Sequence, residues 1–336
     1  MAEKYSRWRD QATGVQPFLY PLPPGNEVST VVELIAWPFG AVAGFVRTLL
    51  VVLLLLVQTL MVEGILRTLS IWPPLYATLS RFVNAGICRL VLAVLGVVWI
   101  NVDSVQLRKT GRSPPKIPFD PKKGDIIVAN SSSYVDLLFL VFRYNATLTL
   151  PVGSGPASSA TTQVIGWQRV SLLRAFLASG TLPQQGTDAE SLTKLLERAD
   201  GPVVIFPECT TSNNRAILKF GDFAPSAAEE VKSGRIFILA FRYSPPTSFA
   251  PSLTHPIPTV VAPWLPIPLG HLYALTSRFI PYTLTIRRLH PSESPKQLEW
   301  SSLADTLAAT ARLKRVGALG WKEKAAFLEF RKLKGR

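Results

Sequence analysis

The chain has 336 residues, of which 48% are apolar and only 17% are charged. Lysine and arginine number 36 against 22 aspartates and glutamates, which gives a formal net charge of +14. This length suits one large α/β domain with appendages. Because the positive charge lies beside apolar segments and no nucleic-acid reader motif accompanies it, we expect an anionic lipid surface and no nucleic-acid partner.

The two cysteines, Cys88 and Cys209, predict neither a disulfide framework nor a metal site. The first 30 residues are polar and rich in proline. They lack the short apolar core and small-residue cleavage site of a secretory signal. We therefore expect 1–30 to be a polar N-terminal segment.

An apolar run from Val31 to Val62 follows. Its window from Pro38 to Val62 is long enough to cross a bilayer, but it contains Arg47 and Gln58, and a charge is costly at the bilayer centre. A bent or hairpin anchor and one straight span both fit this pattern. The number and topology of the spans stay open.

A second helix is predicted from Leu79 to Ile100, after a break at the proline pair of Ile71–Leu79. Its apolar residues are interrupted by Arg81, Asn84 and Arg89, which suits either an interfacial amphipathic helix or a core-packing helix. We assign 31–101 to membrane-anchoring helices.

Short apolar runs alternate with helical patterns from about residue 102 onward. Such alternation predicts an α/β domain at 102–290, with a mixed, mostly parallel sheet flanked by helices, behind an N-terminal membrane-embedded helical anchor. A basic helical tail is expected at 291–336. The predicted strands are 125–129, 147–152, 202–206, 235–240 and 282–286, and the predicted helices are 188–199, 303–313 and 322–334.

Two polar loops follow two of these strands, at the strand ends where open α/β sheets place their sites. The first is Asn130-Ser-Ser-Ser-Tyr-Val-Asp136, and the second is Phe206-Pro-Glu-Cys-Thr-Thr-Ser-Asn-Asn-Arg-Ala-Ile-Leu-Lys-Phe220. Both are long, polar and close to a buried strand. We also expect serines of the first loop to cap the helix that begins near Asp136.

Together the two loops resemble the first and third signature blocks of the glycerolipid (lysophospholipid) acyltransferase family. The opening segment Glu3–Phe18 is similar to the N-terminus of fungal oleoyl-CoA lysophosphatidic acid acyltransferases of endoplasmic reticulum and lipid droplets. The resemblance implies transfer of an acyl group from acyl-CoA, as co-substrate, to a lysophospholipid. It implies no bound cofactor and no metal.

In this family a histidine takes the proton from the acceptor hydroxyl, and an aspartate five positions later orients it. Asp136 occupies the aspartate position, but Ser131 stands where the histidine is expected. Three interpretations follow: catalysis through positioning and electrostatics, a distant histidine that folds back (His271 is our choice), or a fold that has lost catalysis.

The third block of the family holds the substrate phosphate. The resemblance assigns this role to Glu208 and Thr210, and Arg215 and Lys219 are the nearest cations. Cys209 replaces the family glycine, which predicts an ordinary backbone angle or a changed turn. The second block lacks its usual arginine, which leaves Arg169 and Arg174 as candidates.

The leading hypothesis is an enzyme that converts lysophosphatidic acid to phosphatidic acid, with its membrane site at the endoplasmic reticulum and the lipid droplet. The alternative is a catalytically silent protein of the same fold that binds lipid or recruits partners there. The sequence leaves the acyl-chain preference and the oligomeric state open.

Overall fold

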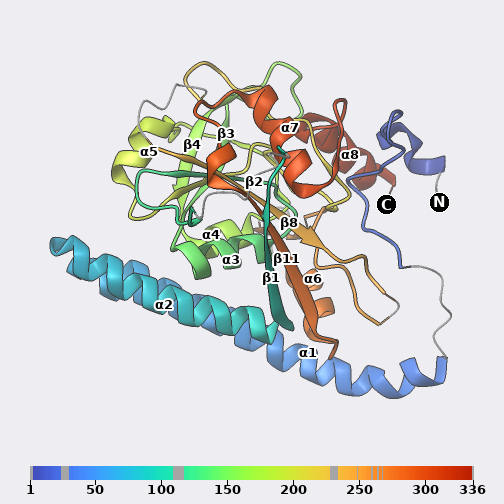
Figure 1. Cartoon of the computed structure of the whole chain (residues 1–336). Helices are drawn as coiled ribbons and strands as arrows, with labels where there is room; N and C mark the ends of the chain where they lie inside the picture. Colours follow the sequence, from blue (N-terminus) through green and yellow to red (C-terminus); the bar gives the residue numbers. More distant parts are fainter. Residues whose placement is uncertain are drawn as a thin grey trace.

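The computed structural model describes residues 3–23, 30–108, 117–227, 234–247, 249–258, 260–262, 265–266 and 268–334. Within these residues a central sheet is covered by helices on both faces, and two long helices lie side by side below it (Figure 1). The strands of the sheet are β1 (Val97–Val105), β2 (Ile126–Ala129), β3 (Thr147–Gly153), β4 (Val164–Val170), β5 (Gln184–Gln185), β6 (Val203–Ile205), β8 (Ile236–Tyr243) and β11 (Tyr282–Leu289).

The strand order is β1–β11–β8–β2–β6–β3–β4, with β5 beside β3. Strands β8, β2, β6 and β3 run parallel to their neighbours in this series. Strand β11 pairs antiparallel with β8, and β4 pairs antiparallel with β3. The predicted mixed, mostly parallel sheet flanked by helices is confirmed.

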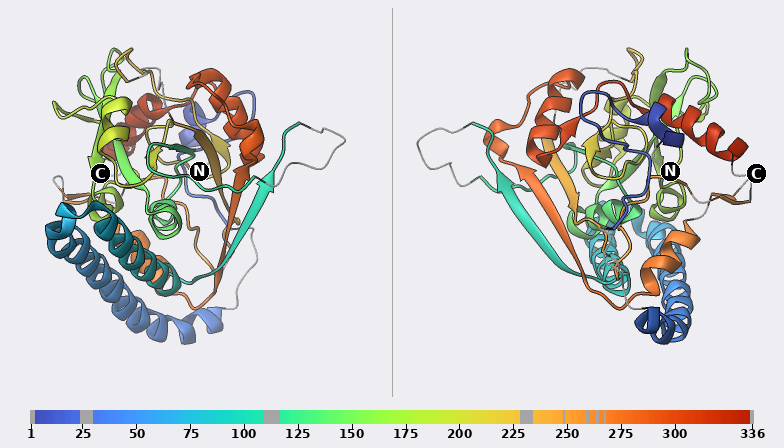
Figure 2. Two further views of the ribbon diagram at one scale, coloured as in Figure 1. Left: turned by 60° about the vertical axis from the view of Figure 1, so that its left-hand side comes forward. Right: turned by 90° about the vertical axis from the view of Figure 1, so that its right-hand side faces the viewer.

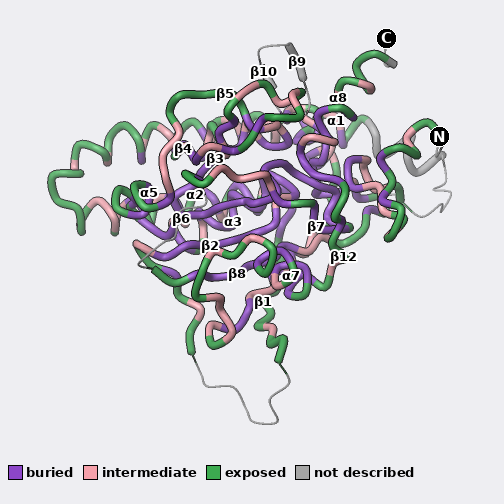
Figure 3. The backbone as a smooth tube through the Cα atoms, turned by 90° about the horizontal axis from the view of Figure 1, so that it is seen from above, coloured by how far each residue is buried: buried purple, intermediate pink, exposed green. Residues whose placement is uncertain are grey.

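Side chains of the central strands point alternately into two separate cores, as the period of two in a strand requires. Ile127 and Ala129 of β2 face a core shared with α3 (Tyr134–Tyr144), α4 (Leu172–Leu177) and α6 (Leu269–Thr276), whereas Ile126 and Val128 face α5 (Leu192–Arg198) and α7 (Trp300–Ala311). The strands are therefore apolar on both faces, and Figure 3 shows them buried at the centre of the molecule.

The apolar N-terminal run forms α1 (Thr30–Thr59), which continues through single turns at Leu60–Ile65 and Leu66–Ile71 to α2 (Pro73–Val94). Stretches Pro38–Ile71 and Pro73–Val94 are long and apolar enough to cross a membrane. Figure 2 shows the two helices packed along one side of the α/β domain. The predicted N-terminal apolar helix is thus present, and it is docked along its length rather than separate from the domain.

The polar residues of α1 face the domain. Arg47 Nη1 donates to the carbonyls of Thr276 and Arg278, at 3.0 and 2.8 Å. Gln58 Nε2 donates to Asn84 Oδ1 of α2 at 2.9 Å. A Cβ on Gly40 would lie 2.7 Å from the Ser277 carbonyl oxygen, so this contact requires glycine. The residues that interrupt the apolar pattern are therefore the ones that fasten α1 to the fold.

Two details of the expected anchor are wrong. The break at the proline pair is shorter than expected: the chain leaves the helical conformation at Trp72, and the prolines at 73 and 74 start α2, because a helix tolerates proline in its first turn. Val97–Val105 is an edge strand and not the end of a helix. Parallel pairing with β11 decides its conformation, and that partner lies far away in the sequence.

The two terminal segments meet at one side of the domain (Figure 1). The 3-10 helix η1 (Glu3–Trp8) packs on α8 (Trp321–Lys334), with the Trp8 ring 5.3 Å from Phe327 and 4.8 Å from Phe330. Asn213 Nδ2 of the second loop donates to the carbonyls of Gln16 and Leu19. The remaining short elements are β7 (Ala216–Ile217) paired with β12 (Lys314–Arg315), β9 (Val260–Ala262) paired with β10 (Leu265–Pro266), and η4 (Pro291–Glu293).

Candidate active site

The two motif loops converge because their strands are neighbours. Strands β2 and β6 pair in parallel, so both loops leave the same edge of the sheet. Ser212 N donates to the Ser131 carbonyl at 3.0 Å. Asn214 Nδ2 donates to Ser132 Oγ at 2.8 Å. These contacts join the first loop to the second before any ligand binds.

Asp136 lies fully buried in the first turn of α3. Its Oδ2 accepts hydrogen bonds from the backbone N–H groups of Ser132 and Ser133, at 2.7 and 2.9 Å, and Tyr243 Oη donates to its Oδ1. Ser133 caps α3 and completes a capping box with Asp136, as expected for this loop. The three donors lower the pKa of Asp136, but burial outweighs them and raises it to about 7.

Glu208 connects the two loops through hydrogen bonds to a backbone amide of each. Its Oε1 accepts from Ser131 N at 3.0 Å, and its Oε2 accepts from Leu218 N at 2.9 Å. The side chain is fully buried, and burial raises its pKa to about 8. Both carboxylate oxygens are thus occupied by backbone amides.

Cys209 adopts a left-handed backbone conformation, which glycine takes most readily, with φ at +56°. The expectation of an ordinary angle is therefore wrong. Glu208 fixes the chain on one side, and Cys209 N donates to the Phe206 carbonyl at 3.0 Å. The sulfur packs beside Val164 and Trp321, and burial raises the thiol pKa well above its usual range. Cys209 consequently fills space.

A buried lysine from α8 supports the second loop. Lys324 Nζ donates to Thr210 Oγ1 at 2.7 Å and to the Thr211 carbonyl at 2.8 Å. Burial lowers the pKa of Lys324 to about 7, against a smaller opposing effect of Glu208. The sequence predicts only that this residue belongs to the basic helical tail, because nothing in the local pattern separates it from the other lysines there.

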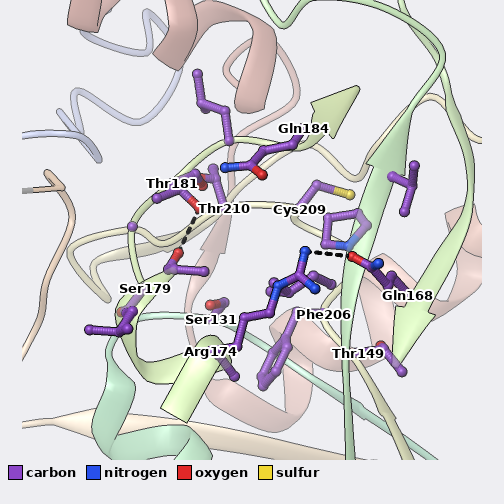
Figure 4. A pocket seen from close by; sticks show the side chains of 18 of the residues that line it. Ser131, Thr149, Gln168, Arg174, Ser179, Thr181, Gln184, Phe206, Cys209 and Thr210 are labelled. Atoms are coloured by element: carbon purple, nitrogen blue, oxygen red, sulfur yellow. Dashed lines mark hydrogen bonds between the residues drawn. The ribbon is translucent and has the colours of Figure 1, made fainter. Parts of the chain in front are cut away.

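A cavity of about 420 Å³ opens above these loops. It is lined by Ser131 of the first loop, by Cys209 and Thr210 of the second, and by Arg174 of α4 (Figure 4). Apolar side chains form much of the remaining wall, among them Leu137, Leu150, Val152, Leu177, Leu182 and Phe206. A cavity of this size that combines apolar walls with convergent polar side chains suits a small-molecule site.

The wall carries few charged groups. Arg174 contributes a guanidinium whose Nη2 donates to Gln168 Oε1 at 3.0 Å, as Figure 4 shows. Asp188 contributes a carboxylate. Ser131 Oγ has no hydrogen-bond partner among the described residues, although its backbone amide is held by Glu208. No histidine lines the cavity within the described ranges.

The histidines lie outside the cavity wall. His271 is buried, with Nδ1 against Tyr134 Oη at 3.0 Å and Nε2 against the Ser252 carbonyl at 2.9 Å. His255 lies closer to the wall, since a Cβ on Gly180 would come within 3.1 Å of its Nδ1. Burial lowers the pKa of His271 to about 4, and that of His255 well below the usual value.

Arg215 and Lys219 do not line this cavity. Lys219 is exposed and pairs with Asp222 at 3.3 Å. Arg215 faces a different hollow, described below. Of the substrate-binding residues expected from the sequence, Thr210 therefore lines the cavity and Glu208 lies beneath it. No cluster of three histidine, cysteine or acidic side chains in the described part of the chain could hold a metal ion.

Comparison with known proteins supports the family resemblance of the two loops. A protein of Schizosaccharomyces pombe named "Putative lysophosphatidic acid:oleoyl-CoA acyltransferase" is 28% identical over 336 residues, covering 99% of both chains. The resemblance to the acyltransferase family is confirmed. No family model matches the chain, and no solved structure matches it.

The match extends to segments that carry no signature block. It covers α1, α2 and the terminal segments beside the second loop, so the sequence likeness to this relative extends along nearly the whole chain. The geometry adds that Asp136 has no histidine to orient within the described residues, and that its oxygens hold the first loop instead.

Proposed function

We propose that this protein transfers an acyl group from acyl-CoA to lysophosphatidic acid, producing phosphatidic acid. The observation that carries the proposal is the cavity where the two signature loops meet. Its apolar wall suits an acyl chain, and Arg174 suits a phosphate because a guanidinium can form two parallel charge-assisted hydrogen bonds. The named S. pombe relative supports the same substrates.

The cavity favours catalysis by positioning. Since no imidazole lines the wall within the described residues, the reaction depends on holding the acceptor hydroxyl against the thioester and on stabilising the developing oxyanion. Ser131 Oγ is free to donate to that oxyanion. As the new ester C–O bond forms, the thioester C–S bond breaks, and the hydroxyl proton passes through water to the departing CoA thiolate, which leaves as the thiol.

Membrane attachment through α1 and α2 forms part of this proposal. The outward face of α1 exposes large apolar side chains, including Phe39 at 71% and Phe45 at 66%. Its inward face is fastened to α6 through Arg47. An apolar face opposite a docked face suits a helix lying in one leaflet. We place the protein at the endoplasmic reticulum membrane and the lipid droplet.

The test is acyl transfer by the purified full chain in phospholipid vesicles. Radiolabelled oleoyl-CoA and lysophosphatidic acid should yield labelled phosphatidic acid. Ser131→Ala should lower kcat by about 100-fold, the lower end of what one lost oxyanion donor costs. Arg198→Gln is the matched control, because Arg198 is exposed and pairs with Glu190 away from the cavity. No transfer to any common lysophospholipid would overturn the proposal.

The absence of an imidazole from the described wall favours one second candidate: a silent protein that binds lipid through the same cavity. The two proposals differ in the fate of the ligand. A silent protein would bind labelled lysophosphatidic acid, lose that binding with Arg174→Gln, and release the lipid without an added acyl chain. Complementation of a deletion strain by Ser131→Ala with full effect would favour this reading.

A further inference from the structure

A second hollow, of about 410 Å³, lies beside the next stretch of the second loop. Four cationic side chains line it: Arg215, Arg242, Arg312 and Lys314. No carboxylate appears among its described lining residues. Such a one-signed lining focuses a positive potential into a confined space.

Local structure brings the four cations together from three segments of the chain. Strand β12 pairs in parallel with β7, with Lys314 opposite Ala216, so Arg215 and Lys314 are close neighbours. Arg242 Nη1 donates to the Arg312 carbonyl at 3.1 Å. Arg312 caps α7 in the left-handed conformation, with φ at +50°. The arrangement is therefore built into the fold.

These cations lack the partners that their neighbours have. None of the four makes an ion pair within the described residues, whereas Arg315, adjacent to Lys314, pairs with Asp305 at 2.8 Å. The pKa of nearby Arg287 is lowered, mainly by burial and further by Arg312 and Arg242. Mutual repulsion of this kind is relieved when an anion enters.

The hollow is also lined by residues of the frame, which is the hydrogen-bonded network around Asp136 and Glu208 beneath the first cavity. Tyr243 and Asn214 both line it. Tyr243 Oη donates to Asp136, and Asn214 Nδ2 donates to Ser132 Oγ. A ligand in the hollow would therefore contact the residues that hold the first loop in place.

We propose that the hollow binds a ligand with clustered phosphate groups on an organic body. Several phosphates match four unpaired cations, and apolar lining from Val15, Pro21 and Leu313 accommodates a ring. The 3′-phosphate and diphosphate of acyl-CoA are one source of this chemistry, and that source rests on the proposed function. A free nucleotide or diphosphate is the other.

Binding to the full chain in detergent micelles tests the proposal, with 3′-phosphoadenosine 5′-phosphate and inorganic pyrophosphate as probes in calorimetric titrations. Arg215→Gln/Lys314→Gln should weaken both by about 10-fold or more, as expected for two lost charge-assisted contacts. Neither side chain donates a hydrogen bond within the described residues, so the fold should survive. Arg315→Gln, on the same short strand, should change binding less than about 2-fold.

Competition separates the two sources. Displacement of 3′-phosphoadenosine 5′-phosphate by oleoyl-CoA, together with a raised KM for oleoyl-CoA in the double variant, would assign the hollow to the acyl donor. Probe binding without displacement would assign it to a free nucleotide or diphosphate. Unchanged binding by the folded double variant, or no binding of either probe to the wild-type chain, would overturn the inference.

Acyl transfer is measured on the same samples, so the two proposals fail separately. Probe binding that responds to the double variant in a protein without transferase activity would leave this inference standing and remove the proposed function. Acyl transfer by a protein that binds neither probe would remove this inference and leave the proposed function standing.

Discussion

The frame beneath the cavity, which is the hydrogen-bonded network around Asp136 and Glu208, uses its polar groups differently from the wall that lines the cavity. In the frame, Asp136 and Glu208 direct both carboxylate oxygens at protein donors. On the wall, Ser131 Oγ has no partner among the described residues, and Arg174 is exposed. The acidic residues of the two loops therefore hold the backbone in place, whereas Ser131 and Arg174 line the cavity.

The largest effect should come from breaking the frame. Asp136→Ala leaves two buried amides and the Tyr243 hydroxyl without an acceptor, so we expect a loss of about 3 to 5 kcal/mol in the free energy of unfolding. Urea denaturation in detergent measures it. Tyr243→Phe removes one donor and keeps the ring, and should cost about 1 kcal/mol. Equally small losses of unfolding free energy in both variants would show that these hydrogen bonds contribute little to stability.

The frame should also make stability depend on pH. Between pH 4.5 and about 8 the folded chain keeps a proton on Glu208 that the unfolded chain has lost, so stability falls as pH rises. Asp136 acts in the same direction between pH 3.8 and about 7. From about pH 7 to 10.5 the unfolded chain holds a proton that Lys324 has released, so stability rises again.

Buried His255 and His271 act in the opposite direction below about pH 6.5, because the unfolded chain holds protons there that the folded chain has released. We therefore expect the lowest stability between about pH 7 and 8, with most of the fall toward it above about pH 6.5, measured by urea denaturation across the range. Glu208→Gln should reduce this fall, because the amide does not titrate, and Lys324→Met should flatten the alkaline limb. A pH profile that neither variant changes would contradict the buried, titrating frame.

Changing the wall should affect substrate and leave the fold intact. Arg174→Gln should raise KM for lysophosphatidic acid by about 10-fold, which corresponds to about 1.4 kcal/mol, because a phosphate loses a charge-assisted contact. Denaturation midpoints should match those of the wild type. The exposed Arg198→Gln is the control, and a KM shift shared by both variants would point to general electrostatics instead.

The smallest effect concerns the residue that joins frame and wall. Cys209→Gly removes the strain of a left-handed side-chain residue, about 1 kcal/mol, and loses sulfur packing of similar size. Thermal unfolding should therefore change little. Cys209→Ala keeps the strain and loses the sulfur, so it should be the less stable of the two. If Cys209→Gly were the less stable variant, the left-handed backbone at this position would carry no cost in free energy.

The central strands could be predicted because their apolar runs are short and buried on both faces. Strands β2, β3, β6 and β8 begin within one residue of their predicted starts. Strand β1 was missed because it is mostly exposed and depends on pairing with β11. Long-range pairing of this kind leaves little trace in a local sequence pattern.

For the site, the sequence located the two loops but not the orientation of their side chains. Thr210 lines the cavity, whereas Arg215 lies outside it, because the loop turns at Asn214, where φ is +59°. The role of Lys324 was missed because what separates it from the other lysines of the tail is its burial against the second loop, which lies far away in the sequence. Neighbours along the chain are thus poor guides to neighbours in a loop-built site.

Lys324 gives the order of chain synthesis a consequence for assembly. Its ammonium group supports Thr210 and Thr211, yet it follows every strand of the central sheet along the chain. Helices α1 and α2 emerge from the ribosome long before it. We expect the apolar hairpin to reach the lipid surface while the second loop still lacks its support, so that the cavity closes only on a protein already held at its membrane.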